Sequence, residues 1–523
     1  MSLRRSSGIL LHPTSLPGPY GIGELGSHAH RFVDWLAASG QRVWQVMPLG
    51  PTGYGDSPYQ CFSAYAGNPY LISLERLAQE GWLTDADLAE GRDLPDARVD
   101  YGAVIPFKVE MLSRAERRFA GEADADTREA FAAFERDHAE WLDDYALFMA
   151  LKDVHGGRPW NEWDEGLRDR DPAALDDAVT RHADAIRRHR TWQYWFHRQW
   201  LDVKAHANAA GIEVVGDLPI FIAYDSVDAW ANRELFFFDD EGRPTVVAGV
   251  PPDYFSATGQ RWGNPLYRWS RMKARGYAWW ISRFRSTLEF VDVIRVDHFR
   301  GFEAYWEIPA SEPTAVEGRW VRGPGQPFFD AVQEALGELP IIAEDLGVIT
   351  PAVEQLRDAN GLPGMKVLQF AFAGDASDPY LPHNYGSDFV VYTGTHDNDT
   401  TRGWYETAPE SERDHVRRYL ARSDANIAFE LIRLAQASVA DLAVYPLQDT
   451  LSLGSEARMN TPGKPSGNWT WRFAWDDLPD WLPSHLNEMA RLYGRSGLAE
   501  ATDTPYRQSV TTKDVEDDRS EPT

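Results

Sequence analysis

Eight short apolar segments, spread along the whole chain, constrain its fold more than any other feature of the sequence. Each is rich in β-branched or other apolar residues and is flanked by turn residues, as expected of strands buried on both faces. The eight segments are 8–11, 42–48, 212–217, 291–297, 339–344, 365–372, 389–393 and 442–446. Helical patterns lie between several of them, at 29–38, 277–290, 329–336, 351–358 and 413–437. Strands that alternate with helices predict an α/β fold, a parallel (β/α)8 or TIM barrel.

Two of the gaps between the predicted strands are longer than a crossover requires. Residues 71–210 are charged, rich in tryptophan and patterned as helices, whereas residues 221–275 are rich in glycine, proline and aromatic residues. We expect a helical insertion in the first gap and an irregular, lid-bearing insertion in the second, both in βα loops. Residues 1–501 would then form a single catalytic barrel domain, without a separate C-terminal β-sandwich. The polar segment 502–523 is expected to be a disordered tail.

Composition excludes several classes of protein. With 43% hydrophobic and 25% charged residues, the 523-residue chain can bury a large core. No apolar run approaches the roughly 18 residues of a membrane-spanning helix, and the N-terminal apolar stretch is too short for a secretory signal. The single cysteine, Cys61, can form neither an internal disulfide nor a thiolate zinc site by itself. We therefore expect a cytoplasmic globular protein that has no membrane partner.

The charge balance is strongly acidic. The chain has 80 acidic and 52 basic residues, and its net charge is −28. Such a surface repels phosphate backbones, so nucleic acid is not an expected partner. Lysine is scarce and arginine supplies most of the positive charge. Acidic excess with few lysines favours a protein adapted to concentrated salt, where screening weakens self-repulsion, although an ordinary acidic enzyme from a GC-rich genome is the alternative.

Charged residues follow four of the predicted strands. In chain order these residues are Asp217, Arg295, Asp297, His298, Glu344, His396 and Asp397. Because the carboxyl ends of barrel strands converge on one pocket, we expect these side chains to face one another. Arg295 and Asp297 are two residues apart on a strand, so they share a face. Any one of the acids could be a helix cap, but four charged strand ends with Arg or His neighbours favour a catalytic constellation.

Convergent carboxylates suit glycoside chemistry. That chemistry requires one carboxylate as nucleophile or base and another as acid, on either side of the bond, around an oxocarbenium-like transition state. Sugar sites also need aromatic platforms, and the chain has 21 tryptophans and 21 tyrosines. Most of these aromatic residues are expected in the core. The candidates for the site are loop aromatics near strand ends, namely Tyr54, Tyr59, Tyr254, Phe255 and Trp262.

Longer motifs resemble those of one enzyme family. The segments GYGDSPYQ (53–60), GDLPI (216–220), IRVDHFRG (294–301), AEDLG (343–347) and GTHDN (394–398) are similar to those of the 4-α-glucanotransferases. This family, also called amylomaltase or disproportionating enzyme, belongs to the α-amylase clan. The similarity runs from about residue 7 to residue 498. It extends beyond the clan motifs to residues 251–265, 382–385, 458–463 and 467–472.

The resemblance implies a reaction and the residues that perform it. In a retaining 4-α-glucanotransferase, Asp297 would be the nucleophile, Glu344 the general acid and base, and Asp397 the transition-state stabiliser. The implied substrate-binding residues are Tyr54, Ser57, Tyr59, Asp217, Phe255, Trp262, Arg295, His298, His396 and Asn460. The implied substrates are maltooligosaccharides and starch-type α-1,4-glucans, with glucose or another glucan as acceptor. No cofactor and no metal ion is expected.

The two catalytic carboxyl groups need different protonation states. We expect Asp297 to stay ionised because Arg295 lowers its pKa, and Glu344 to keep its proton in a less solvated or more negative surrounding. Transfer also requires that a sugar hydroxyl outcompetes water, a role that the resemblance assigns to a lid at residues 251–262. Two alternatives stay open: an α-glucan hydrolase of the same clan, and a non-catalytic glucan-binding protein.

Overall fold

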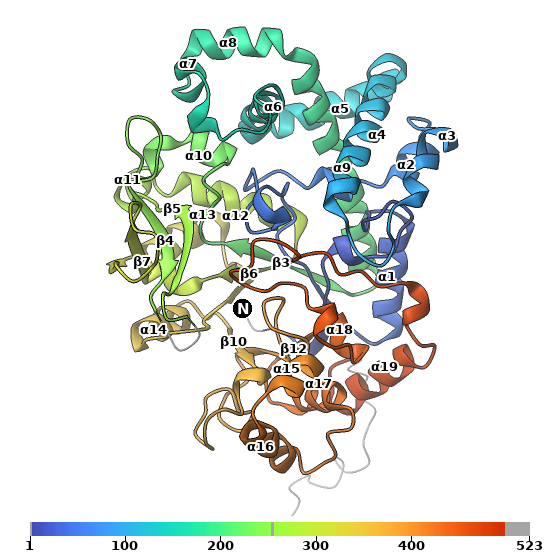
Figure 1. The fold of residues 1–523 in the computed structure, drawn as a ribbon, viewed down its shortest axis with the longest axis vertical. Helices are drawn as coiled ribbons and strands as arrows, with labels where there is room; N and C mark the ends of the chain where they lie inside the picture. Colours follow the sequence, from blue (N-terminus) through green and yellow to red (C-terminus); the bar gives the residue numbers. More distant parts are fainter. Residues whose placement is uncertain (1–2, 253–255, 497–523) are drawn as a thin grey trace, which may run out of the picture.

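A parallel barrel forms the centre of the computed structural model, which describes residues 3–252 and 256–496 (Figure 1). Eight strands pair in the order β10-β11-β12-β1-β2-β3-β6-β9, and every pair is parallel. They are β1 (Ser6–Leu10), β2 (Val43–Gln45), β3 (Glu213–Pro219), β6 (Val293–Asp297), β9 (Ile341–Ala343), β10 (Gly364–Val367), β11 (Phe389–Tyr392) and β12 (Leu442–Pro446). The N–H of Ala343 donates to the carbonyl of Pro363 at 2.9 Å, which joins β9 to the start of β10. The predicted (β/α)8 barrel is confirmed.

The apolar character of the eight segments explains their place in the barrel. All residues of β1 and β12 are buried, as expected of strands covered on both faces. Gly8 in β1 permits the close approach of β2, because a Cβ there would lie 2.4 Å from the carbonyl oxygen of Val43.

Helices surround the barrel, and one segment predicted as a single helix forms two helices. The helices outside the insertions are α1 (Ser27–Ala38), α12 (Ala278–Phe290), α13 (Gln326–Leu336), α14 (Pro351–Ala359), α15 (Thr401–Thr407), α16 (Glu410–Leu420), α17 (Ile427–Ala437), α18 (Leu447–Thr450) and α19 (Leu482–Leu492). The prediction of one helix over 413–437 is wrong. Ala421 ends α16 in the left-handed region at φ 51°, and the side chain of Asn426 caps α17 by accepting from the N–H of Phe429.

The long gap between β2 and β3 is filled by helices, at the top of Figure 1. They are α2 (Leu74–Gln79), α3 (Asp85–Leu88), α4 (Tyr101–Glu122), α5 (Ala125–Asp137), α6 (Ala139–Val154), α7 (Glu165–Arg168), α8 (Pro172–Arg181) and α9 (Ala183–Ala209). We call residues 71–210 the helical insertion. Its last helix, α9, also packs on the barrel: the indole N–H of Trp200 donates to the carbonyl of Phe290, at the end of α12, at 2.8 Å.

The second insertion is more regular than expected. Residues 221–275 contain α10 (Val227–Ala231), α11 (Trp269–Ala274) and two strands, β4 (Val246–Val250) and β5 (Gln260–Pro265). These strands form an antiparallel sheet with β7 (Ala304–Pro309) and β8 (Arg319–Arg322), in the order β5-β4-β7-β8. The prediction of an irregular segment is wrong because β4 pairs with β7, a strand from the connection between β6 and β9. Such a distant pairing leaves no local pattern in the sequence.

The C-terminal part adds no further sheet to the described structure. Among residues 447–496, the regular elements are α18, α19 and short 3-10 turns, so no β-sandwich follows the barrel there, as predicted. The tail predicted to be disordered, 502–523, lies outside the described residues. Within 3–252 and 256–496, no helix combines the length and the apolar character that crossing a bilayer requires.

Candidate active site

The charged strand ends meet at one end of the barrel. Asp217 lies in β3, Arg295 and Asp297 lie in β6, and Glu344 directly follows β9. Asp397 lies in the loop after β11. Because the strands are parallel, all of these side chains lie at the carboxyl edge of the barrel, where barrel enzymes carry their active sites.

Arg295 is shared by two carboxylates. Its Nη1 lies 2.6 Å from Oδ2 of Asp217 and 3.1 Å from Oδ1 of Asp297. The hydroxyl of Tyr59 donates to the same Oδ2 of Asp217 at 2.7 Å. The side chains of Arg295 and Asp217 are 5% and 1% exposed, whereas that of Asp297 is 30% exposed. The fixed cation therefore lies beneath Asp297, whose carboxylate stays open to the cleft.

A left-handed residue orients Glu344. His298 has φ 52° and ψ 47°, an uncommon conformation for a residue with a Cβ. In it, the backbone N–H of His298 donates to Oε2 of Glu344 at 2.6 Å. The N–H of Leu346 donates to Oε1 at 2.9 Å. Two backbone donors thus fix the carboxyl group of Glu344 beside the strand that carries Asp297.

Burial raises the pKa of both catalytic carboxyl groups. The pKa of Asp297 is raised to about 8, mainly by desolvation and further by the charges of Asp217, Glu344 and Asp397, against the opposing charge of Arg295. The pKa of Glu344 is also raised, with desolvation as the largest cause. The prediction that Asp297 has a lowered pKa is therefore wrong: Arg295 does lower it, but desolvation and the neighbouring carboxylates outweigh that effect. Both shifts favour the protonated form of these carboxyl groups.

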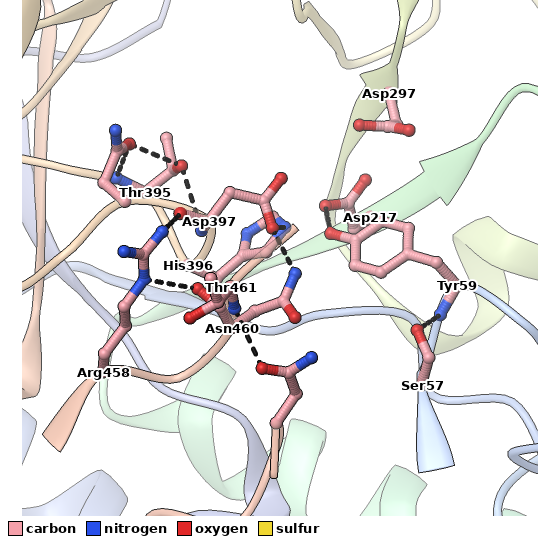
Figure 2. A network of polar contacts seen from close by, with 12 residues as sticks. Ser57, Tyr59, Asp217, Asp297, Thr395, His396, Asp397, Arg458, Asn460 and Thr461 are labelled. Carbon is pink, nitrogen blue, oxygen red and sulfur yellow. Dashed lines mark hydrogen bonds and ion pairs between the residues drawn. The ribbon is translucent and has the colours of Figure 1, made fainter. Parts of the chain in front are cut away.

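Asp397 is positioned by a loop rather than by a strand. The side-chain amide of Asn460 donates to Oδ1 of Asp397 at 2.6 Å, and Nε2 of His396 lies 3.4 Å from that oxygen. Arg458 donates to the main-chain carbonyl of Asp397 at 2.6 Å. Figure 2 shows the carboxylate of Asp397 directed across the cleft toward Asp217 and Asp297. At 48% exposure it remains accessible to a ligand.

Aromatic rings line two sides of this cleft. Tyr59 stacks on His396 with ring centroids 5.2 Å apart, and Trp469 lies 5.9 Å and 5.8 Å from the same two rings. Trp262 of β5 packs edge-on against His298 at 4.8 Å. Tyr59 and Trp262 are partly exposed and can offer a flat apolar surface to a sugar ring, whereas Trp469 and His396 are buried behind Tyr59.

Some predicted binding residues lie at the edge of this network or outside the described residues. Ser57 accepts a hydrogen bond from the N–H of Tyr59 at 3.2 Å, so it shapes the loop (Figure 2). Tyr54 is 77% exposed at the surface of the same loop. Phe255 lies outside the described residues, as does Tyr254.

Two site residues had no predicted role. Arg458 holds the loop of Asp397, and Trp469 completes the aromatic cluster around Tyr59. Both lie in the family-like motifs 458–463 and 467–472, and Arg458 is two residues before Asn460. That spacing was the available signal, but only the folded loop shows what each side chain contacts.

Two unpartnered atoms point to a polar ligand. In the described part of the chain, Oδ1 of Asp217 and Nε2 of His298 are buried without a hydrogen-bond partner. Buried polar atoms are normally paired, so unpaired ones in a cleft favour a ligand that supplies hydroxyl groups. The other oxygen of Asp217, Oδ2, is bound by Arg295 and Tyr59, and Glu344 is bound by a backbone N–H group.

Comparison with known proteins gives a consistent result. A family model described as 4-alpha-glucanotransferase matches residues 11–477. The chain is 56% identical over 498 residues to the 4-alpha-glucanotransferase of Thermus thermophilus, which covers 94% of this chain and 99% of the relative. It is 44% identical to the chloroplastic/amyloplastic 4-alpha-glucanotransferase of Solanum tuberosum, over 94% of this chain and 87% of the relative.

A solved structure agrees with the fold over nearly the same span. The amylomaltase from Streptococcus agalactiae, in complex with acarbose, superposes with a TM-score of 0.91 at 38% identity. The match covers 94% of this chain and 100% of that structure.

Proposed function

The chain belongs to the 4-alpha-glucanotransferase family, and we propose that Asp297, Glu344 and Asp397 perform its reaction as nucleophile, acid/base and transition-state stabiliser. The observation that carries these assignments is the different environment of the first two groups. Asp297 projects into the cleft above the Arg295 cation, whereas Glu344 is held by two backbone N–H donors at 2.6 Å and 2.9 Å. One group is placed to attack and the other to transfer a proton.

The proposed reaction has two steps. First, Glu344 donates its proton to the glycosidic oxygen of an α-1,4 bond, and Asp297 attacks C1 to form a covalent glycosyl-enzyme. Then Glu344 removes the proton from the 4-hydroxyl of an acceptor, which attacks C1 and displaces Asp297. Two inversions give net retention. The proposed donors are maltooligosaccharides and starch-type α-1,4-glucans, and the acceptor is glucose or another glucan.

The proposed cycle needs one proton on this pair of carboxyl groups. The reaction begins with Asp297 ionised and Glu344 protonated, the singly protonated state of the pair. Transfer of that proton to the leaving group leaves Glu344 ionised, ready to act as base in the second step. The Arg295 guanidinium, 3.1 Å from Asp297, stabilises its carboxylate each time the covalent bond breaks.

The remaining polar groups suit the hydroxyls of the reacting sugar. Asp397 is held by Asn460 and stays half exposed, and Asp217 and His298 each have one buried polar atom without a partner. Hydrogen bonds to these hydroxyls that strengthen at the transition state would accelerate both steps. Tyr59, stacked on His396, offers the apolar platform.

Incubation with maltotriose tests transfer against hydrolysis. A transferase forms glucose and longer oligomers while the total number of reducing ends stays nearly constant. An α-glucan hydrolase of the same clan would raise the number of reducing ends, and a glucan-binding protein would give no products; either result would overturn the proposal. The cytoplasmic location stays a prediction.

A further inference from the structure

Three possible metal ligands meet outside the catalytic cleft. His138 lies at the junction of α5 and α6, His197 lies in α9, and Glu289 lies one residue before the end of α12. Nε2 of His197 is 2.6 Å from Oε1 of Glu289, and Nε2 of His138 is 4.0 Å from the same oxygen. One ligand atom from each residue lies within 4.8 Å of the others. In the described part of the chain, no other group of three or more His, Cys, Asp or Glu side chains meets this condition.

The surroundings favour a defined site over a chance surface cluster. The side chains of His138 and His197 are 14% and 15% exposed, and that of Glu289 is 35% exposed. The ring of Phe134 packs on both histidines, at 4.6 Å and 5.3 Å, and Phe290 packs on His197 at 5.7 Å. The aromatic rings fix the two imidazoles, while the glutamate side stays open to water.

We propose that His138, His197 and Glu289 bind one Zn²⁺ ion, with water in the fourth position. Two imidazole nitrogens and one carboxylate oxygen form a ligand set typical of zinc, which prefers four tetrahedral ligands. Bonds of about 2.0–2.1 Å to zinc place neighbouring ligand atoms roughly 3.3 Å apart. The 2.6 Å and 4.0 Å distances lie on either side of that value, so small side-chain rotations would complete the site.

One lysine lies on the glutamate side of the site. The nearby Lys204 ammonium donates to the carbonyls of Glu289 and Val291 and lies 3.4 Å from Asp292, so its charge is already partly compensated.

The position of the site indicates what the ion would do. His138 and His197 belong to the helical insertion, whereas Glu289 belongs to the helix that leads into β6. Asp297 follows Glu289 by eight positions in the sequence. A bound ion would therefore tie the insertion to the barrel directly behind the strand that carries the proposed nucleophile. Its role is structural, and the inference does not depend on the proposed catalytic roles.

Titration of the chelator-treated full chain with ZnCl2, followed by calorimetry, tests the site. We expect one ion per chain, with a dissociation constant of about 1 µM or below at pH 7.5. His138→Gln and Glu289→Gln should each weaken binding by more than about 100-fold, because each removes a ligand rather than an outer contact. Zinc should also raise the melting temperature of the wild type and not that of either variant.

His206→Gln provides the matched control. His206 lies on the same helix as His197 and pairs with a single carboxylate, Nε2 to Oδ1 of Asp34 at 2.8 Å. The His206→Gln variant should bind zinc with the affinity of the wild type. Zinc binding absent from the wild type, retained by His138→Gln and Glu289→Gln, or lost equally in His206→Gln would overturn the proposal. Circular dichroism and maltotriose turnover check that each variant is folded. Because Glu289 is the most exposed of the three ligands, Glu289→Gln is the variant expected to disturb folding least.

Discussion

The catalytic cleft and the helical insertion hold their charges in opposite ways. In the cleft, one arginine that is 5% exposed lies between Asp217 and Asp297. On the insertion, Arg190 is 29% exposed and pairs with Asp143, which is 61% exposed, and with Glu135 at 3.2 Å. Both regions contain one arginine between two carboxylates. The arginine of the cleft is much less exposed to water than the arginine of the insertion.

Because the two regions differ in exposure, we expect them to respond differently to pH and to salt. Buried charges interact through a medium of low polarity, so their pKa values shift and dissolved ions reach them poorly. Exposed pairs are screened within a Debye length of about 10 Å at 0.1 M salt. We therefore expect pH to act through the cleft and salt to act on the acidic surface.

The largest effect is expected from loss of the proposed nucleophile. Asp297→Ala should lower kcat by more than about 10⁴-fold while glucan binding stays measurable, because the covalent route is removed and the binding groups remain. The matched control is Asp143→Ala on the insertion, which should keep wild-type turnover. Near wild-type activity of Asp297→Ala, measured as glucose release from maltotriose, would refute the assignment.

Removal of the buried arginine should be the next largest effect. Arg295→Met leaves Asp217 without its cation and should lower the free energy of unfolding by about 3–5 kcal/mol. Arg190→Met on the insertion should lower the free energy of unfolding by about 0.2–1 kcal/mol, the range measured for exposed ion pairs. Urea denaturation of both variants measures the contrast. Equal losses would mean that burial does not distinguish the two regions.

The same variant also tests the pH response. In the wild type, kcat/KM should form a bell, because the singly protonated pair of Asp297 and Glu344 is the active state. Loss of the Arg295 cation raises the pKa of Asp297 further, so the acid limb should move to higher pH. Arg190→Met should leave both limbs in place. An acid limb that moves to lower pH in Arg295→Met would contradict the electrostatic account.

A smaller effect is expected from the residue that holds Asp397. Asn460→Ala removes the 2.6 Å hydrogen bond to Oδ1 of Asp397 and should lower kcat/KM by roughly tenfold, the value of one hydrogen bond to a charged group. The unfolding free energy should barely change because the contact is exposed. A large loss of stability without a kinetic effect would assign Asn460 a structural role instead.

The smallest effect is expected from salt. The net charge of −28 is repulsive at low ionic strength, so the melting temperature should rise by a few degrees between millimolar and molar KCl. As the KCl concentration rises, the loss of unfolding free energy caused by Arg190→Met should become smaller. The loss caused by Arg295→Met should stay nearly constant. A flat or falling melting temperature of the wild type would favour an ordinary acidic enzyme over a salt-adapted one.

The sequence predicts features that local patterns encode. The apolar runs such as 442–446 predict the barrel strands, and the acids at the strand ends predict which side chains meet. The helix break at Ala421 escapes prediction because the break is a backbone conformation that the residue type does not favour. The sheet of β4 and β7 escapes prediction because its partners are distant in the chain.

The pKa values of the site residues are harder to predict from the sequence than which residues form the site. That Arg295 and Asp297 share a face follows from their spacing. The raised pKa of Asp297 depends mainly on desolvation in the folded site and then on the charges of the other carboxylates around it. The cluster of His138, His197 and Glu289 has no motif spacing at all. The packing of α9 and α12 near the junction of α5 and α6 brings it together.

Trapping of the covalent intermediate tests the central claim most directly. Glu344→Gln should react with glucosyl fluoride, whose leaving group needs no proton, and should accumulate glycosyl-enzyme because the base for the second step is missing. Digestion and mass spectrometry of the quenched protein locate the modification. The account predicts one added glucosyl unit on the peptide that contains Asp297. No adduct on any peptide, or an adduct on a residue other than Asp297, would contradict it.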